Sequence, residues 1–176
     1  MSKKNVHVNR RGFLKTAAAA GAALAGPYVL SSTVLGKDGA VAPSEKITLG
    51  AMGIGGRGSY DLGCILREED VQVVAVADVR GDRRARAKRM VDQRNGNENC
   101  MAYIDFREMF ARKDIDAVLI ATGNNWHGLA SILAAKAGKD VYCEKPCTRN
   151  IVESLELAKT FQRTGRVFQG GMQRRN

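Results

Sequence analysis

The sequence predicts an α/β protein built on a doubly wound parallel sheet, and three observations predict it. Short apolar runs, typical of strands that are buried on both faces, alternate with stretches whose apolar residues recur at helical spacing. A glycine-rich turn follows the first apolar run, and an acidic residue ends the second. Because strands that alternate with helices form parallel sheets with right-handed crossovers, we expect ligands at the carboxyl ends of the strands.

Residues 1–42 are expected to be a signal peptide and linker outside the fold. Residues 9–15 read Asn-Arg-Arg-Gly-Phe-Leu-Lys, and a weakly apolar run follows them. This segment resembles a twin-arginine export signal, from which it departs only at Asn9, where Ser or Thr is usual. Residues 40–42, Ala-Val-Ala, offer a small-x-small cleavage pattern, although Pro43 would then begin the mature chain.

This leader leads to expectations about location and partners. The uncharged run 16–36 is rich in Ala, Gly, Ser and Thr, so it would partition only weakly into lipid and is not expected to be a stable membrane anchor. We expect the twin-arginine export machinery as a partner and a periplasmic or secreted location. Since that route carries folded proteins, it suits a protein that captures a soluble cofactor before export.

The first strand is predicted over residues 47–52, and residues 53–58 read Gly-Ile-Gly-Gly-Arg-Gly before a helical pattern. In a G-x-G-x-x-G turn the first glycine permits the tight turn, the second lets the backbone approach a pyrophosphate, and the third lets the helix pack close to the strand. The start of the helix then offers unpaired N–H groups to a diphosphate. The expected cofactor contacts in this turn are Gly53, Gly55, Gly56, Arg57 and Gly58.

The second strand is predicted over residues 71–78, and its last residue, Asp78, follows the final glycine of the turn by 20 positions. A carboxylate there accepts hydrogen bonds from the adenosine ribose and repels a 2′-phosphate, so the spacing favours NAD over NADP. Arg80, Arg83 and Arg84 are close enough in the sequence to tolerate a phosphate, which keeps NADP possible. The alternative is an aspartate that ends the strand without a ligand.

The second half of the chain repeats the alternation. A short helix is predicted over residues 105–110, a buried strand over 115–122, and a polar loop over 123–127 that opens a helix over 128–137. A further strand over 140–143 runs into Glu-Lys-Pro.

The last predicted helix begins with a capping box, in which Asn150 is followed three residues later by Glu153. This helix carries apolar residues at helical spacing up to Phe161, and a further strand begins at Val167.

The excess of basic over acidic residues is local. The chain holds 28 Lys and Arg against 18 Asp and Glu, for a formal charge of +10. Six bases crowd into residues 83–94 without aromatic neighbours, which predicts a solvated helix face and no nucleic-acid partner. The four cysteines form no pair of C-x-x-C motifs, so we expect core thiols and no metal site.

Residues 46–176 resemble the Gfo/Idh/MocA family, the oxidoreductases typified by glucose-fructose oxidoreductase, inositol dehydrogenase and the rhizopine-catabolism proteins. The likeness rests on the glycine turn, on Val-Ala-Asp at 76–78, on the segments 105–108 and 121–127, and above all on Glu-Lys-Pro at 144–146. The chain departs from the family after the fourth strand, where Thr-Gly replaces the usual Thr-Pro.

The resemblance implies a Rossmann domain over residues 43–176 that binds NAD, and a sugar or polyol substrate. It implies that Lys145 is the acid–base or proton-relay side chain, in a site where a partly desolvated lysine beside a cationic nicotinamide has a lowered pKa. Gln173 and Arg174 are weak candidates for the substrate side. The further cofactor contacts that it implies are Thr122, Asn124, His127 and Glu144.

Two neighbouring side chains have alternative roles. His127 either contacts cofactor or substrate, or is a structural donor at the start of a helix. Trp126 either stacks on a ring or covers the core.

Relatives in this family continue into a second α/β domain that supplies an Asp/His catalytic pair and most substrate contacts. The present chain stops at Asn176, so we expect a polypeptide that lacks the substrate domain, and a homo-oligomer only together with that domain.

Three hypotheses follow. The chain is the N-terminal part of an exported NAD(P)-dependent oxidoreductase that transfers hydride between nicotinamide and a sugar or polyol, an NAD-dependent glycosidase of related sequence, or a non-catalytic nucleotide-binding module.

Overall fold

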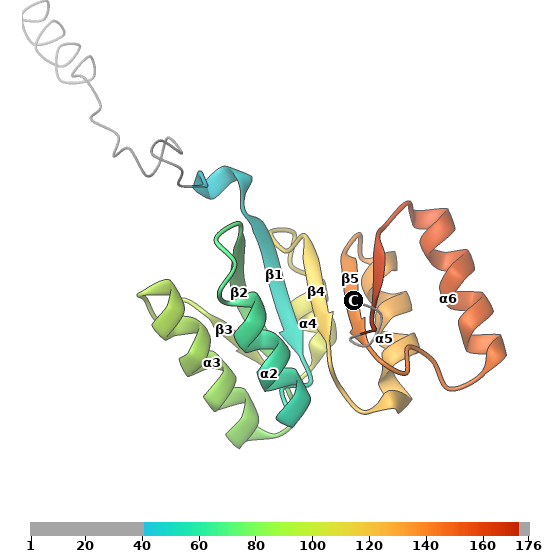
Figure 1. Cartoon of the computed structure of the whole chain (residues 1–176), viewed down its shortest axis with the longest axis horizontal. Coiled ribbons are helices and arrows are strands. Elements are labelled where there is room, and N and C mark those ends of the chain that lie inside the picture. Colours follow the sequence, from blue (N-terminus) through green and yellow to red (C-terminus); the bar gives the residue numbers. More distant parts are fainter. Residues whose placement is uncertain (1–40, 173–176) are drawn as a thin grey trace, which may run out of the picture.

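The protein forms a six-stranded, all-parallel sheet in the order β3-β2-β1-β4-β5-β6, as seen in a computed structural model that describes residues 41–172 (Figure 1). The strands are β1 (Ile47–Met52), β2 (Val71–Ala77), β3 (Met101–Tyr103), β4 (Ala117–Ile120), β5 (Asp140–Glu144) and β6 (Phe168–Gly171). The strand order reverses between β1 and β4, and ligands of such sheets bind in the crevice at that point. The predicted fold class is confirmed. The predicted leader, up to residue 40, and the weak candidates at 173 and 174 lie outside the described residues.

Helices cover both faces of the sheet (Figure 1). The helical segments are the 3-10 turn η1 (Pro43–Glu45) and the helices α2 (Gly56–Ile65), α3 (Gly81–Asn95), α4 (Phe106–Phe110), α5 (Asn124–Lys136) and α6 (Ile151–Thr164). Along β4, Val118 and Ile120 join the core cluster under α4, α5 and α6, whereas Leu119 joins the cluster under α2 and α3. This alternation leaves no side of the strand in water, which explains its continuous apolar sequence.

The start of α5 differs from the prediction, because the helix begins at Asn124, four residues before the predicted 128. Gly123 precedes it with φ −67° and ψ 148°. This φ is close to the value that a proline ring imposes, so a proline at this position would be compatible with the backbone. Polar residues are tolerated in a first helical turn, and the segment therefore looked like a loop. Trp126 and His127 consequently lie on the helix.

Strand β3 is too short to be recognised from an apolar pattern. It has three residues, Met101 is 52% exposed, and no member of the strand is buried. Its pairing with β2 and not its own sequence defines it.

The predicted capping box at α6 is half confirmed. Asn150 Oδ1 accepts a hydrogen bond from the Glu153 N–H at 2.9 Å. The Glu153 carboxylate, however, accepts from the N–H of Arg149 at 2.7 Å, one residue before the position that a reciprocal box requires. The helix ends at Gly165, whose φ of 65° is the left-handed conformation that favours glycine.

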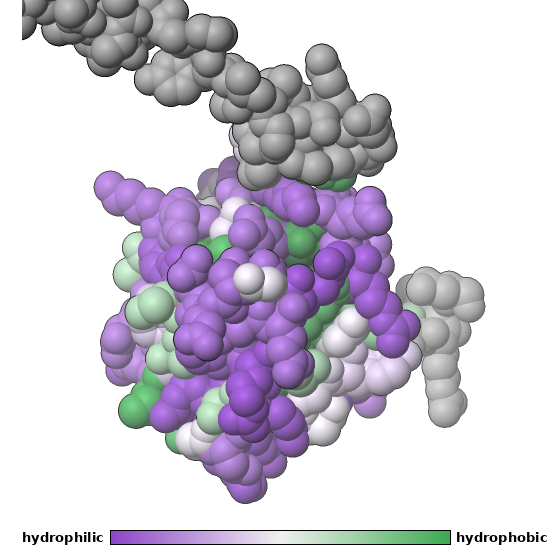
Figure 2. Space-filling view, turned by 90° about the vertical axis from the view of Figure 1, so that its left-hand side faces the viewer, coloured by the Kyte–Doolittle hydropathy of each residue, from purple (hydrophilic) through white to green (hydrophobic). Residues whose placement is uncertain are grey.

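The basic residues of α3 mostly have partners within the fold. Arg86 donates to the Ile54 carbonyl at 3.2 Å, and Arg94 donates to the Leu66 carbonyl. The side of the molecule that carries α3 is largely hydrophilic (Figure 2). These basic side chains therefore connect α3 to the two ends of α2, while the rest of their surface faces solvent.

Two of the four cysteines are core thiols as predicted. Cys100 and Cys143 are buried, and burial raises the pKa of Cys100 to about 11 and that of Cys143 to about 12. Cys64 and Cys147 are only half-buried. Within residues 41–172 no helix is both long and apolar enough to cross a membrane.

Candidate cofactor and active site

In the turn after β1, close packing requires glycine at the first and third glycine positions. Gly53 has φ +77°, and a side chain there would come within 2.5 Å of Thr122. A side chain at Gly58 would come within 2.3 Å of the Gly53 carbonyl oxygen. At Gly56, by contrast, a side chain would meet none of the described atoms within 4 Å. The N-terminus of α2 is therefore held tightly from behind and is open in front, as a bound diphosphate requires.

Asp78 lies directly beside this turn, and main-chain groups fix its orientation. Its Oδ2 accepts a hydrogen bond from the Ile54 N–H at 2.8 Å, and its Oδ1 accepts from the Arg80 N–H at 2.9 Å. The side chain of Arg84 donates to the Asp78 carbonyl at 2.6 Å. A carboxylate oxygen has two lone pairs, so each oxygen retains one for a ribose hydroxyl.

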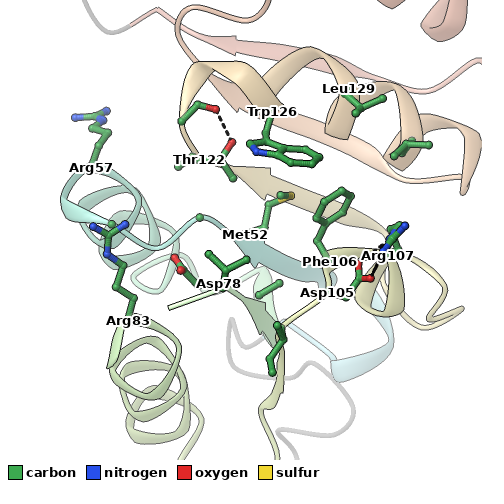
Figure 3. A pocket seen from close by; sticks show the side chains of 18 of the residues that line it. Met52, Arg57, Asp78, Arg83, Asp105, Phe106, Arg107, Thr122, Trp126 and Leu129 are labelled. Atoms are coloured by element: carbon green, nitrogen blue, oxygen red, sulfur yellow. Dashed lines mark hydrogen bonds and ion pairs between the residues drawn. The ribbon is translucent and has the colours of Figure 1, made fainter. Parts of the chain in front are cut away.

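A cavity of about 900 Å³ opens in front of the turn at the carboxyl ends of the strands (Figure 3). Its polar side contains Asp78 and two guanidinium groups, those of Arg57 and Arg83. Its apolar side contains the Phe106 and Trp126 rings, which pack edge to face with centroids 5.9 Å apart. The volume is within the range of small-molecule and cofactor sites. An elongated ligand with an anionic centre and flat rings suits this distribution of charge and apolar surface.

The structure places the predicted cofactor contacts in two groups. Those that line the cavity are Gly53, Gly55, Gly56, Arg57, Asp78 and Thr122. The others, which support it from behind or lie outside its lining, are Gly58, Asn124, His127 and Glu144. The proposed catalytic residue, Lys145, also lies outside the lining, with an exposed side chain.

His127 is buried and both of its ring nitrogens contact main-chain carbonyls. Nδ1 lies 2.7 Å from the Pro146 oxygen and Nε2 lies 2.9 Å from the Thr122 oxygen. The ring thus joins the turn after β4 to the turn after β5. This geometry favours the structural alternative for His127, and it places the side chain behind the site.

Arg57 connects the glycine turn to the Glu-Lys-Pro segment. Its Nε lies 3.1 Å from Glu144 Oε1, and its Nη2 lies 2.7 Å from Asp61 Oδ1. Glu144 Oε2 accepts a hydrogen bond from the main-chain N–H of Lys145 at 3.1 Å. A side chain at Gly171 on β6 would come within 2.9 Å of Glu144 Oε1, so the backbone of β6 also approaches this group closely.

Asp61 is the member of this site that the sequence did not indicate. It lies in the helical stretch after the glycine turn, four residues from Arg57, and it is 6% exposed. The i, i+4 spacing of an arginine and an aspartate is the one signal that was present, and such pairs usually lie on a solvated helix face.

Residues 47–172 match the Gfo/Idh/MocA family, which is described as an oxidoreductase family with an NAD-binding Rossmann fold. The chain belongs to this family. Residues 7–27 match the twin-arginine translocation signal, which directs this Gfo/Idh/MocA protein to export across the membrane. The predicted cofactor class and the predicted export route are confirmed.

Proteins that are similar to this chain carry different names. A glycosyl hydrolase family 109 protein of Solibacter usitatus is 30% identical over 165 residues, which are 90% of this chain and 37% of that protein. Myo-inositol 2-dehydrogenase of Thermotoga maritima is 30% identical over 127 residues, which are 72% of this chain and 36% of that protein. The structure of scyllo-inositol dehydrogenase from Lactobacillus casei with NAD(H) and scyllo-inositol is similar with a TM-score of 0.66 and 26% identity, covering 74% of this chain and 37% of that one. The chain therefore spans less than two fifths of each of these relatives.

Proposed function

We propose that the protein is an exported oxidoreductase that transfers hydride between NAD and a sugar or polyol, with residues 43–176 as its dinucleotide-binding domain. The observation that carries the proposal is the open glycine turn beside an aspartate whose two oxygens are oriented by main-chain N–H groups. The similarity to a myo-inositol and a scyllo-inositol dehydrogenase supports a polyhydroxylated substrate.

The cofactor contacts follow from the two sides of the cavity. The N–H groups at the start of α2 bind the diphosphate, and Arg57 adds a positive charge beside them. Asp78 accepts hydrogen bonds from the adenosine ribose, which favours NAD over NADP. Arg83 lies beside Gly55 and faces the same region, so it is the group that would accommodate a 2′-phosphate. The wall of Phe106 and Trp126 offers apolar surface to a ring of the cofactor.

Lys145 is the proposed acid–base residue. Oxidation of a secondary alcohol removes a hydride from carbon and a proton from the neighbouring oxygen, and NAD accepts the hydride when it is bound. Lys145 follows directly after β5, its main chain is held by Glu144, and its side chain is exposed, so Nζ can reach a ligand that enters from solvent. Its role is to accept that proton from the substrate oxygen and to return it in the reverse reaction.

A glycosidase is the second candidate, because a glycosyl hydrolase family 109 protein is as similar to this chain as the inositol dehydrogenase is. The two candidates share the dinucleotide site and differ in the product. Release of the aryl group from an aryl glycoside indicates the glycosidase, whereas net formation of NADH from a polyol indicates the dehydrogenase. Binding of the nucleotide without either product indicates the third hypothesis, a nucleotide-binding module.

The cofactor site can be tested with the protein's own fluorescence. The sequence holds a single tryptophan, Trp126, which lines the cavity. We expect NADH to quench it saturably, and NADPH to bind more weakly. Asp78→Asn should weaken NADH binding by tenfold or more while leaving the NADPH affinity nearly unchanged, because the repulsive charge is removed together with the ribose acceptor. A signal that does not saturate, or an Asp78→Asn protein that binds NADH as tightly as the wild type, contradicts the assignment.

The substrate class needs a separate experiment. The protein is supplied with NAD and a panel of inositols, linear polyols and aldoses, and NADH formation is followed by absorbance. In a full-length context that includes a substrate domain, we expect turnover with at least one cyclic polyol or aldose. Turnover confined to aryl glycosides would replace the dehydrogenase by the glycosidase.

A further inference from the structure

A buried cluster of charged side chains lies between the first turns of α2 and the end of β5. Arg57 forms ion pairs with two carboxylates, that of Asp61 on its own helix and that of Glu144 on β5. The side chains of Asp61 and Glu144 are only 7% and 4% exposed, whereas that of Arg57 is 43% exposed. One guanidinium group is thus shared by two carboxyl groups that are removed from water.

The two carboxyl groups also face each other. Asp61 Oδ1 and Glu144 Oε1 both contact the guanidinium group of Arg57, and the proximity of Glu144 raises the pKa of Asp61. The second oxygen of Asp61, Oδ2, is buried, and no donor among the described residues reaches it. Two ionised carboxylates in contact repel each other, and a buried carboxylate oxygen without a donor is strongly unfavourable. A single proton on the pair removes both problems, because a protonated carboxyl group donates a hydrogen bond.

We propose that Asp61 and Glu144 share one proton, and that the neutral cluster they form with Arg57 positions the Lys145 segment against the glycine turn. Glu144 binds both Arg57 and the main-chain N–H of Lys145, so it connects the two segments directly. Asp61 acts through these partners and is a positioning residue. The inference rests on the proposed function for the role of Lys145 and the place of the diphosphate.

The other titratable groups around the pair do not compete for this proton. Arg57 is a permanent cation. Tyr142 of β5 and Cys147 of the following turn are the neighbours on the strand side, and burial raises the pKa of each, so both stay uncharged through neutral pH. Cys64 of α2 also lies near Tyr142. The acid pair is therefore the group whose charge changes.

The direction of the pH effect follows from Asp61. Burial raises the pKa of Asp61, the charge of Arg57 opposes the shift, and Glu144 reinforces it. The unfolded chain releases this proton near pH 3.8, and the raised pKa means that the folded protein binds it more tightly. The stability that this proton contributes is fully present below that pH and is lost as the pH rises through the raised pKa. Above it, the cluster carries an additional negative charge beside the diphosphate site.

The proton can be observed without cofactor. Difference infrared spectra of the wild type and Asp61→Asn are compared at pH 6, where an ordinary aspartic acid is ionised. We expect a protonated carboxyl band in the wild type that is absent from Asp61→Asn. Asparagine mimics the protonated acid, because it offers Glu144 a donor and Arg57 an acceptor. The control is Asp114→Asn, which removes an acid that is 59% exposed and paired with Arg112. The protonated carboxyl band of the Asp61–Glu144 pair should remain in this variant.

The effect on the site is measured by NADH titration between pH 5 and 9. The wild type should bind NADH roughly threefold to tenfold more weakly once the pair has lost its proton, because one charge is added at short range to a partly solvated site. Asp61→Asn should bind with a pH-independent affinity close to the low-pH value of the wild type. Asp114→Asn should follow the wild-type profile.

The outcomes separate this inference from the proposed function. Absence of the infrared band in the wild type, or an unchanged band in Asp61→Asn, overturns proton sharing whether or not NADH binds. Should Asp61→Asn fail to fold, Glu144→Gln supplies the same test, since it must also abolish the band. Failure of the wild type to bind NADH at any pH contradicts the proposed function but leaves the infrared test in force. Equal pH profiles for wild type and Asp61→Asn overturn the positioning role.

Discussion

The two halves of the sheet present their functional groups in different ways. In the half that contains β1–β3, the proposed binding groups are main-chain N–H donors and one carboxylate, Asp78, which two further N–H groups hold in place. In the half that contains β4–β6, the proposed functional group is an exposed side chain, Lys145, of which only the main chain is anchored. A group that binds a fixed part of a cofactor gains from complete immobilisation, whereas a group that exchanges a proton must keep a movable end.

The largest effect on activity is expected from a substitution of Lys145, the side chain with the movable end. In a full-length context, Lys145→Ala should lower turnover of the best polyol or aldose by about 10²-fold or more, because the proposed proton acceptor is lost. NADH affinity and the thermal midpoint should stay near wild type, since the side chain is exposed and lies outside the cavity lining. Steady-state kinetics and NADH titration measure the two quantities. Lys145→Ala with wild-type turnover would remove the residue from the mechanism.

The next effect is expected in the immobile half. Gly58→Ala places a Cβ 2.3 Å from the Gly53 carbonyl oxygen, so α2 must move away from β1. We expect a loss of about 2–4 kcal/mol of unfolding free energy, together with loss of NADH binding. Denaturant unfolding and tryptophan quenching report the two changes.

Gly56→Ala is the matched control, because a side chain there meets none of the described atoms within 4 Å. Its stability should equal that of the wild type. A lower NADH affinity in Gly56→Ala would show that the cofactor approaches this backbone. An equal loss of stability in Gly56→Ala and Gly58→Ala would argue against the packing explanation.

A smaller effect is expected where the two halves are joined. His127→Ala leaves the Pro146 and Thr122 carbonyls without their buried partner, which should cost about 2–3 kcal/mol of stability. Asn124→Ala, at an exposed position of the same helical turn, should change stability by less than about 0.5 kcal/mol. Chemical denaturation measures both. If the cofactor affinity of His127→Ala falls far more than its stability, His127 contacts the ligand after all.

The smallest effect is expected at the far edge of the second half. Asn150→Ala removes the side-chain acceptor at the start of α6 and should cost about 1 kcal/mol without changing NADH affinity. Asn150→Asp should restore most of the loss, since aspartate caps equally well. A shift in the thermal midpoint measures both variants, and an unstable Asn150→Asp would show that the cap is not the reason.

Local patterns were sufficient for most of the fold. The buried strands and the turn between β1 and α2 were predicted because their signals lie within a few consecutive residues. The predicted start of α5 is four residues late, since the polar residues of its first turn are as common in a loop as at the start of a helix. Strand β3 has no apolar pattern in its sequence, because none of its three residues is buried. Only its pairing with β2 identifies it as a strand.

By itself, the sequence determined the parallel alternation, the export signal, the glycine turn and the acid at the end of β2. Each depends on residue types at short, fixed spacing along the chain, where backbone geometry leaves little choice. Only the tertiary structure decided that Arg57 pairs with Glu144, 87 positions away, and that Asp61 is buried beside them. Such contacts arise when parallel strands bring their carboxyl ends to one edge of the sheet, and no local pattern records which side chains meet there.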